Sequence, residues 1–147
     1  MRHTVLVALF LLAALVSVRR MFLVTAVSGS SMEPALRSGD SLLVRRTKRV
    51  RAGQVVVFES AELMPARGRG ARRSRAVAVK RAAAVPGDVL PADWESPDTH
   101  ELAGSVVPPG SLVLLGDNRA TSWDSRHHGL VPEKRLVGVV VRHLGTR

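Results

Sequence analysis

The chain contains no cysteine, and this absence limits the chemistry that its 147 residues can perform. Without cysteine there is no disulfide, no thiolate metal ligand and no cysteine nucleophile, and the redox state of the compartment stays open. Aromatic residues are also scarce, at 3% of the sequence with no tyrosine. Surfaces that bind single-stranded nucleic acid by stacking need aromatic side chains, so a stacking platform is not expected here.

Acidic residues are few as well, because 12 Asp and Glu residues stand against 22 Lys and Arg, for a formal net charge of +10 at pH 7. Such a charge favours an anionic partner and carries no information about the fold. Much of it lies in two arginine-rich segments, 45–51 and 67–75. We interpret them as solvated loops or, alternatively, as a surface that docks on anionic lipid, where each basic residue contributes about 1 kcal/mol. Nucleic acid is not an expected partner, because the sequence has no basic recognition helix.

Short runs of β-branched and aliphatic residues follow one another after residue 21. Each ends at a turn signal of Gly, Pro, Asp or Asn, which is the pattern of an all-β domain. The chain is long enough for one domain with its own core. We predict a mostly β, antiparallel and barrel-like fold. The expected strands are 22–27, 41–44, 53–58, 76–85, 111–115 and 136–141.

An apolar run precedes this domain at residues 5–18, with Arg2 before it and Arg19 and Arg20 after it. About 20 apolar residues usually cross a bilayer as a helix, so this run is short. Three interpretations remain open, namely a cleaved signal peptide, a buried core helix and a short membrane anchor. A core helix normally has a polar face, whereas this run is apolar all round. We favour an anchor over residues 1–20, with the flanking arginines reaching the headgroups.

The stretch 27–36 presents serines in a backbone shaped by glycine and proline. Gly29 can adopt a positive φ and allow another backbone to approach, and Pro34 fixes the direction of exit. This backbone suits a serine hydroxyl presented from a bend, although a Ser/Gly-rich loop without a function accounts for the same sequence. A serine needs a nearby proton acceptor to become a nucleophile. The five histidines show no metal-ligand spacing, and none has an obvious carboxylate partner in the sequence.

Lys80 is another candidate base, because residues 76–79 before it and 82–85 shortly after it are apolar. Burial disfavours the ammonium form and lowers a lysine pKa, which makes a general base available near neutral pH. A lysine at the exposed edge of a strand, with its charge in water, explains the same pattern. From composition alone, that second interpretation is the simpler one.

Three blocks of this chain, in this order, resemble the type I signal peptidases, which are membrane-bound serine/lysine proteases. Residues 31–34 (SMEP) resemble their nucleophile box. Residues 79–81 (VKR) followed by 86–88 (PGD) resemble their lysine box. The segment 116–126 (GDNRATSWDSR) is similar to their C-terminal box almost residue for residue. The resemblance covers residues 27–144, and the N-terminal apolar run stands where that family carries its anchor.

This resemblance implies catalytic and supporting residues. Ser31 matches the nucleophile, Lys80 the general base and Ser122 the hydroxyl that orients the lysine. Two ion pairs that would brace the site are also implied, Arg81 with Asp117 and Arg126 with Asp124. A neutral lysine needs a hydrogen-bond partner, such as the Ser122 hydroxyl, to aim its lone pair. The two ion pairs would hold the residues around the dyad in place. No metal or other cofactor is implied.

The backbone N–H of Ser31 would contribute to the oxyanion hole, with Gly29 and Met32 as adjoining substrate-binding positions. Some family members carry a side-chain donor two residues before the nucleophile, where this chain has Gly29. The chain also has Ala35 and Ala84 where threonine and glycine are common in the family. Neither departure removes a reacting group.

The resemblance implies a signal-peptidase/repressor-type β fold over residues 21–147, with the second subdomain reduced to an insertion around 89–108. Such a protein would be held by one N-terminal helix on the outer face of the plasma membrane, as a single-pass protein. It would cleave signal peptides from exported pre-proteins after small residues of the Ala-x-Ala type, through an acyl-enzyme. The implied partners are these pre-proteins and membrane lipid.

Three alternatives stay open. One is a dedicated maturation protease for a single pre-protein or peptide. Another is a self-cleaving repressor of the related serine/lysine fold, which would need a DNA-binding helix-turn-helix where this chain has an apolar run. The third is an inactive basic binding module, whose function would survive the loss of Lys80.

Overall fold

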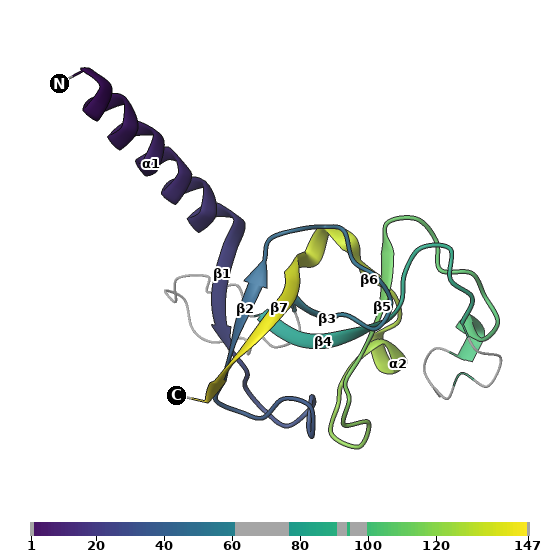
Figure 1. Ribbon diagram of the computed structural model, residues 1–147. Coiled ribbons are helices and arrows are strands. Elements are labelled where there is room, and N and C mark those ends of the chain that lie inside the picture. Colours follow the sequence, from purple (N-terminus) through teal and green to yellow (C-terminus); the bar gives the residue numbers. More distant parts are fainter. Residues whose placement is uncertain (1, 61–76, 91–93, 95–99, 147) are drawn as a thin grey trace, which may run out of the picture.

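One long helix and a curled β-sheet make up the computed structural model, which describes residues 2–60, 77–90, 94 and 100–146 (Figure 1). The helix α1 runs from Arg2 to Met21 and extends away from the sheet. The strands are β1 (Phe22–Ala26), β2 (Asp40–Arg45), β3 (Val55–Glu59), β4 (Val77–Ala84), β5 (Ser111–Leu115), β6 (Val131–Pro132) and β7 (Leu136–Thr146). Short helices lie in the connections, namely η1 (His100–Leu102), α2 (Ser125–His128) and η2 (Glu133–Arg135).

The strands form one antiparallel sheet in the order β1-β2-β7-β3-β4-β5-β6. Register shifts interrupt three of the pairings, between β2 and β7, β3 and β7, and β4 and β5. Such irregularities increase the local twist and bend a sheet. The result is a curled half-barrel, so the prediction of a mostly β, antiparallel and barrel-like fold is confirmed.

Strand β7 is longer than the sequence pattern predicted, because it runs to Thr146 instead of ending at Val141. Its second half pairs with β2 up to the pair Asp40 and Thr146. The side chains of 141–144 are exposed, so this part shows no alternation of apolar and polar residues. Main-chain pairing with β2 extends the strand where side-chain pattern gives no signal. The two-residue strand β6 was not predicted either.

The sheet is buried on both faces around β3, the strand next to β4 in the sheet. Val56 and Phe58 pack in one apolar cluster, whereas Val57 packs in a second one. Successive side chains of a strand point to opposite faces, which accounts for this division. The first cluster also contains Ala82, Leu112, Leu114, Val131, Leu136 and Val139. The second contains Val27, Met32, Leu36, Leu42 and Val44.

Within the part of the chain that the structure describes, helix α1 leaves its apolar side chains exposed. Among its described side chains, Leu6 is 62% and Phe10 is 73% exposed. The interpretation of the apolar run as a buried core helix is therefore wrong. Within the described residues, no helix combines the length and apolarity that crossing a membrane requires.

The segment after β4 makes a short antiparallel excursion. Val89 bridges Val106, and the N–H of Leu90 donates to the carbonyl of Ser105 at 2.9 Å. This covers part of the insertion expected around 89–108, and the remainder lies outside the described residues. The arginine-rich segment 67–75 also lies outside them.

Leu114 tests the importance of the first cluster, because its side chain is fully buried. Leu114→Ala removes apolar contacts and leaves a cavity, so we expect the free energy of unfolding to fall by about 2–5 kcal/mol. Urea unfolding of the full chain in mild detergent, followed by far-UV circular dichroism, measures this. Leu144→Ala is the matched control, since Leu144 is 50% exposed and should cost less than about 1 kcal/mol. Equal losses in the two variants would contradict the assignment of this core.

Candidate active site

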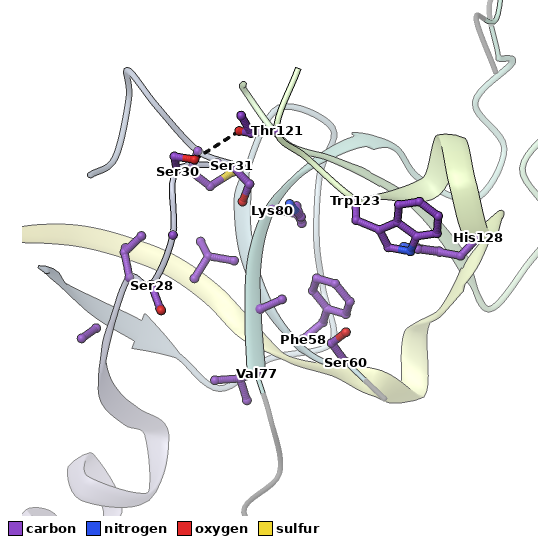
Figure 2. A pocket seen from close by; sticks show the side chains of 16 residues that line it. Ser28, Ser30, Ser31, Phe58, Ser60, Val77, Lys80, Thr121, Trp123 and His128 are labelled. Carbon is purple, nitrogen blue, oxygen red and sulfur yellow. Dashed lines mark hydrogen bonds between the residues drawn. The ribbon is translucent and has the colours of Figure 1, made fainter. Parts of the chain in front are cut away.

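A groove of about 790 Å³ opens on one side of the sheet (Figure 2). Four segments that are distant in sequence line it. They are 26–32 at and after the end of β1, Phe58 and Ser60 in and after β3, 77–80 at the start of β4, and Thr121, Trp123 and His128 near α2. The curl of the sheet brings these segments together.

Ser31 lies in the connection between β1 and β2. The base of this connection is closed, because the N–H of Val27 donates to the carbonyl of Asp40 at 2.8 Å. The next residue, Met32, is 1% exposed and packs in the second apolar cluster, which anchors the loop. The carbonyl of Ser31 accepts a hydrogen bond from the N–H of Asn118 at 3.0 Å. With its backbone held on both sides, Ser31 points its hydroxyl into the groove (Figure 2).

Two glycines shape the backbone here in different ways. Gly29 has φ of 86°, as expected, but a Cβ there would meet nothing within 4 Å, so no backbone approaches it closely. The close approach occurs at Gly116 instead. A Cβ at Gly116 would lie 2.5 Å from the Cβ of Ser122 and 2.5 Å from the carbonyl oxygen of Ser31. Glycine at 116 therefore lets the Ser31 loop and the Ser122 segment come into contact.

Lys80 lies in β4 opposite Val56, and its side chain is 5% exposed. Its Nζ donates a hydrogen bond to the Oγ of Ser122 at 2.7 Å. Burial lowers the pKa of Lys80 from its ordinary value of 10.5. The Asp124 carboxylate opposes this shift and the Arg126 guanidinium supports it, with a lowered pKa as the net result. In Figure 2 the Lys80 amine and the Ser31 hydroxyl point into the same part of the groove.

Asp124 organises the groups around Lys80. Its Oδ2 accepts hydrogen bonds from the Ser122 hydroxyl at 2.6 Å and the Gly116 N–H at 3.0 Å. Arg126 binds both of its oxygens at 2.9 Å. Burial raises the pKa of Asp124, but these hydrogen bonds outweigh burial and lower it to about 2. An ionised carboxylate can only accept, so the Ser122 proton points to Asp124 and the Ser122 oxygen accepts from Lys80.

A second ion pair holds the start of the same segment. Arg81 donates to both oxygens of Asp117, at 2.7 and 2.6 Å, and its Nη1 donates to the carbonyl of Gly53 at 2.8 Å. The hydrogen bonds with Asp117 raise the pKa of Arg81. This pair ties the chain after β5 to β4 and to the turn before β3. The structure thus brings together the pairs that the sequence predicted, although their roles in catalysis stay predictions.

Two histidines have carboxylate neighbours that were not obvious in the sequence. The Nε2 of His143 lies 3.1 Å from an oxygen of Asp40, because β7 pairs with β2. The Nδ1 of His127 lies 3.8 Å from an oxygen of Asp124. The Asp-x-x-His spacing of an N-cap residue and the third helical residue could have indicated the second contact. No such signal exists for the first, which depends on strand pairing.

Sequence reasoning also missed the groove residues Trp123 and His128. Trp123 stands inside the C-terminal box, but the pattern gives no reason to expect it at the groove. Met32 was expected to bind substrate. It lines the groove with few exposed atoms, and its contact with substrate stays a prediction.

Comparison with known proteins decides the family. The model of the family described as "Signal peptidase, peptidase S26" matches residues 1–95 and 91–144. The chain belongs to this family. The resemblance seen in the three sequence blocks is confirmed, and membership of the signal peptidase family implies a serine peptidase.

Among the relatives, signal peptidase I of Bacillus caldolyticus is 28% identical over 89% of this chain and 85% of that protein. The probable signal peptidase I-2 of Synechocystis is 28% identical over 76% of this chain and 58% of that protein. The chloroplastic thylakoidal processing peptidase 1 of Arabidopsis thaliana is 26% identical over 77% and 39%. The chain therefore spans less than two thirds of the length of the latter two proteins. A crystal structure of a signal peptidase I from Enterococcus faecalis aligns with a TM-score of 0.41 and 22% identity, over 62% of this chain and 96% of that one.

The pKa of Asp124 predicts an acid-dependent loss of stability. The pKa is about 2 in the folded chain and 3.8 ordinarily, so ionisation stabilises the fold above about pH 4. This contribution, about 2 kcal/mol, is lost as the pH falls from about 4 toward 2. Asp124→Asn leaves Arg126 without its carboxylate, so we expect it to lose about 3 kcal/mol at pH 7.

Urea unfolding of the full chain at pH 7 and pH 3 measures this effect. Asp124→Asn should show a smaller difference between the two pH values than the wild type. Glu133→Gln, which removes a carboxylate outside the groove, should keep the wild-type difference. An Asp124→Asn variant with the full wild-type difference would show that another group carries the acid dependence.

Proposed function

We propose that this chain is a signal peptidase that cleaves exported pre-proteins after small residues, with Ser31 as nucleophile and Lys80 as general base. The observation that carries the proposal is the buried Lys80, hydrogen-bonded to Ser122 and facing the groove that Ser31 also lines. The family to which the chain belongs supports a peptidase of this kind.

The hydrogen bonds suggest how the lysine is aimed. A neutral amine has two N–H groups and one lone pair. With one N–H donated to Ser122, the lone pair of Lys80 is free to accept the proton of Ser31. Ser31 Oγ then attacks the scissile carbonyl carbon, and Lys80 passes the proton to the leaving amine. Water, deprotonated by Lys80 in turn, releases the acyl group from Ser31.

The negative oxygen that forms during attack needs hydrogen-bond donors. We assign this role to the backbone N–H of Ser31, next to Gly29 and Met32, by analogy with the family. The Asn118 N–H bond to the Ser31 carbonyl supports the assignment, since it fixes the peptide plane on the other side of the residue. A fixed donor stabilises developing charge without reorganisation.

The substrate is expected to bind as an extended strand. Strand β1 lies at one edge of the sheet, and 77–80 of β4 pair with β3 on one side, while the pairs with β5 begin at Arg81. Both β1 and the start of β4 therefore offer main-chain groups along the groove, which suits addition of a peptide strand. Ala26, Gly29 and Ala78 line this part and favour small substrate side chains.

The dyad is tested by cleavage of a synthetic precursor peptide with an Ala-x-Ala site. Ser31→Ala and Lys80→Ala should each lower kcat/KM at least about a thousandfold. Lys80→Arg should be equally inactive, because a guanidinium stays protonated. In the wild type, kcat/KM should rise with pH along a limb that lies below 10.5, since only the neutral amine of Lys80 accepts a proton.

His143→Ala is the control, because His143 pairs with Asp40 outside the groove and should retain activity. Equal cleavage by Ser31→Ala and the wild type would overturn the dyad. Cleavage of one natural precursor, but of no general Ala-x-Ala peptide, would instead favour a dedicated maturation protease.

We further propose that α1 anchors the catalytic domain, residues 21–147, at a membrane, with the groove on the outer face. The exposed apolar side chains of α1 and the arginines that follow them support this. Because the run is shorter than the roughly 20 residues of a usual span, a crossing would need local thinning of the bilayer. Anionic lipid would be attracted by Arg19 and Arg20.

Flotation of the full chain with vesicles tests the anchor. The wild type should float with phosphatidylcholine vesicles, and more completely when they contain phosphatidylglycerol. Leu9→Glu combined with Phe10→Glu should reduce flotation by about tenfold or more, because charge is costly in the apolar layer. Val106→Glu, at a residue 58% exposed on the domain, is the matched control and should float like the wild type. Equal flotation of all three proteins would contradict an anchor at α1.

A further inference from the structure

Trp123 is a large apolar side chain that the fold leaves open to solvent. It is 62% exposed although it lines the same groove as Lys80 (Figure 2). It is one of two tryptophans in a chain with 3% aromatic residues. Burying apolar surface is favourable, so a ligand that covers the indole gains binding free energy. Tryptophans placed in this way often carry much of the energy of an interface.

The indole is held in one orientation before any ligand arrives. Its ring stacks on His127, with centroids 4.3 Å apart and planes 22° from parallel. The Nδ1 of His127 in turn accepts a hydrogen bond from the backbone N–H of Asp124 at 3.4 Å, as part of the N-terminal cap of α2. A ligand that binds to a fixed ring loses less conformational freedom than one that must order it. Trp123 is thus a preformed wall of the groove.

This wall lies close to the site of bond cleavage. Trp123 directly follows Ser122, whose Oγ is 2.7 Å from the Nζ of Lys80. In Figure 2 the indole lies on the same side of the groove as Phe58, with Ser28 on the other side. An extended peptide advances about 3.3 Å per residue. Because Ser31 and Trp123 line the same groove, a peptide with its scissile bond at Ser31 brings a side chain near that bond to the indole.

The charge around the indole selects among possible side chains. A cation can bind the face of an aromatic ring, but one face of Trp123 is covered by His127. The carboxylate of the adjacent Asp124 is already paired with Arg126, and the chain carries a net charge of +10, which disfavours a cationic side chain. An uncharged aliphatic or aromatic side chain is not repelled by the net positive charge and can pack against the exposed part of the indole.

We propose that Trp123, positioned by His127, is a specificity-determining residue that accepts a bulky aliphatic or aromatic substrate side chain near the scissile bond. This inference rests on the proposed function, in that the groove must bind a peptide for cleavage. The proposed function already includes a preference for small residues before the cut. The contact with Trp123 adds a preference for a large apolar side chain at a different substrate position.

Cleavage of a peptide series tests the proposal. Peptides with an Ala-x-Ala site carry Leu or Ser in turn at each remaining position within two residues of the cut. The wild type should prefer Leu at one position, and Trp123→Ala should lower kcat/KM for that peptide by about tenfold while the Ser peptide changes little. Trp123→Phe should keep most of the preference. Trp94→Phe, which alters the other tryptophan, should leave both rates unchanged. An equal loss on every peptide, or an unaltered preference in Trp123→Ala, would overturn the proposal.

Binding without turnover separates this inference from the proposed function. In a Trp94→Phe, Ser31→Ala variant of the full chain, Trp123 is the sole fluorophore of its kind, and the Leu peptide should shift its emission saturably. The Ser peptide should require a higher concentration. If the wild type cleaves no peptide but the Leu peptide shifts the emission, the cleavage proposal fails and the Trp123 contact stands. If all peptides are cleaved with no emission change, the contact fails and the cleavage proposal stands.

Discussion

The arrangement of the groove depends on the buried carboxylate of Asp124. It binds the Ser122 hydroxyl, the Gly116 N–H and Arg126, and thereby joins the end of β5 to the start of α2. A neutral amide at this position could accept with one group only and could not hold both sets of donors. The pKa of about 2 expresses the strength of these bonds in the folded chain. Because the carboxylate stays ionised, the direction of each hydrogen bond toward Lys80 is determined.

Apolar packing and main-chain pairing position Ser31 and Lys80, whereas ion pairs position the segment that carries Ser122. The buried Met32 fixes the Ser31 loop from the core side, and β3 and β4 fix Lys80 through main-chain pairing. The segment that carries Ser122 has no strand of its own and is held by Arg81–Asp117 at its start and Arg126–Asp124 at its end. Charged pairs with several hydrogen bonds restrict a loop more than a single neutral bond does. A loop held in this way can present a hydroxyl with the accuracy that catalysis needs.

The sequence allowed the strands and the class of fold to be predicted, because each apolar run ends at a turn residue. It did not allow the end of β7 to be predicted, since exposed side chains there carry no pattern. The meeting of Ser31, Lys80 and Ser122 could not be derived from local pattern either, because they lie on three segments that are distant in sequence and meet only in the folded chain. Only the resemblance to a family linked them. His143 and Asp40 show the limit of that route, because their contact follows from strand pairing and belongs to no motif.

The carboxylate of Asp124 has two opposed effects on a lysine base. It orients Ser122, the hydrogen-bond partner of Lys80, but its negative charge also favours the protonated form of Lys80. Burial is the main cause of the lowered pKa of Lys80; Asp124 opposes this shift, and Arg126 adds to it. The Asp124 carboxylate favours the ammonium form of Lys80, so without Arg126 the pKa of Lys80 would be lowered less. By pairing with Asp124, Arg126 offsets this charge while leaving Oδ2 available to Ser122. The ion pair thus separates the two effects of the carboxylate: its geometry is kept for orienting Ser122, and part of its effect on the pKa of Lys80 is offset by Arg126.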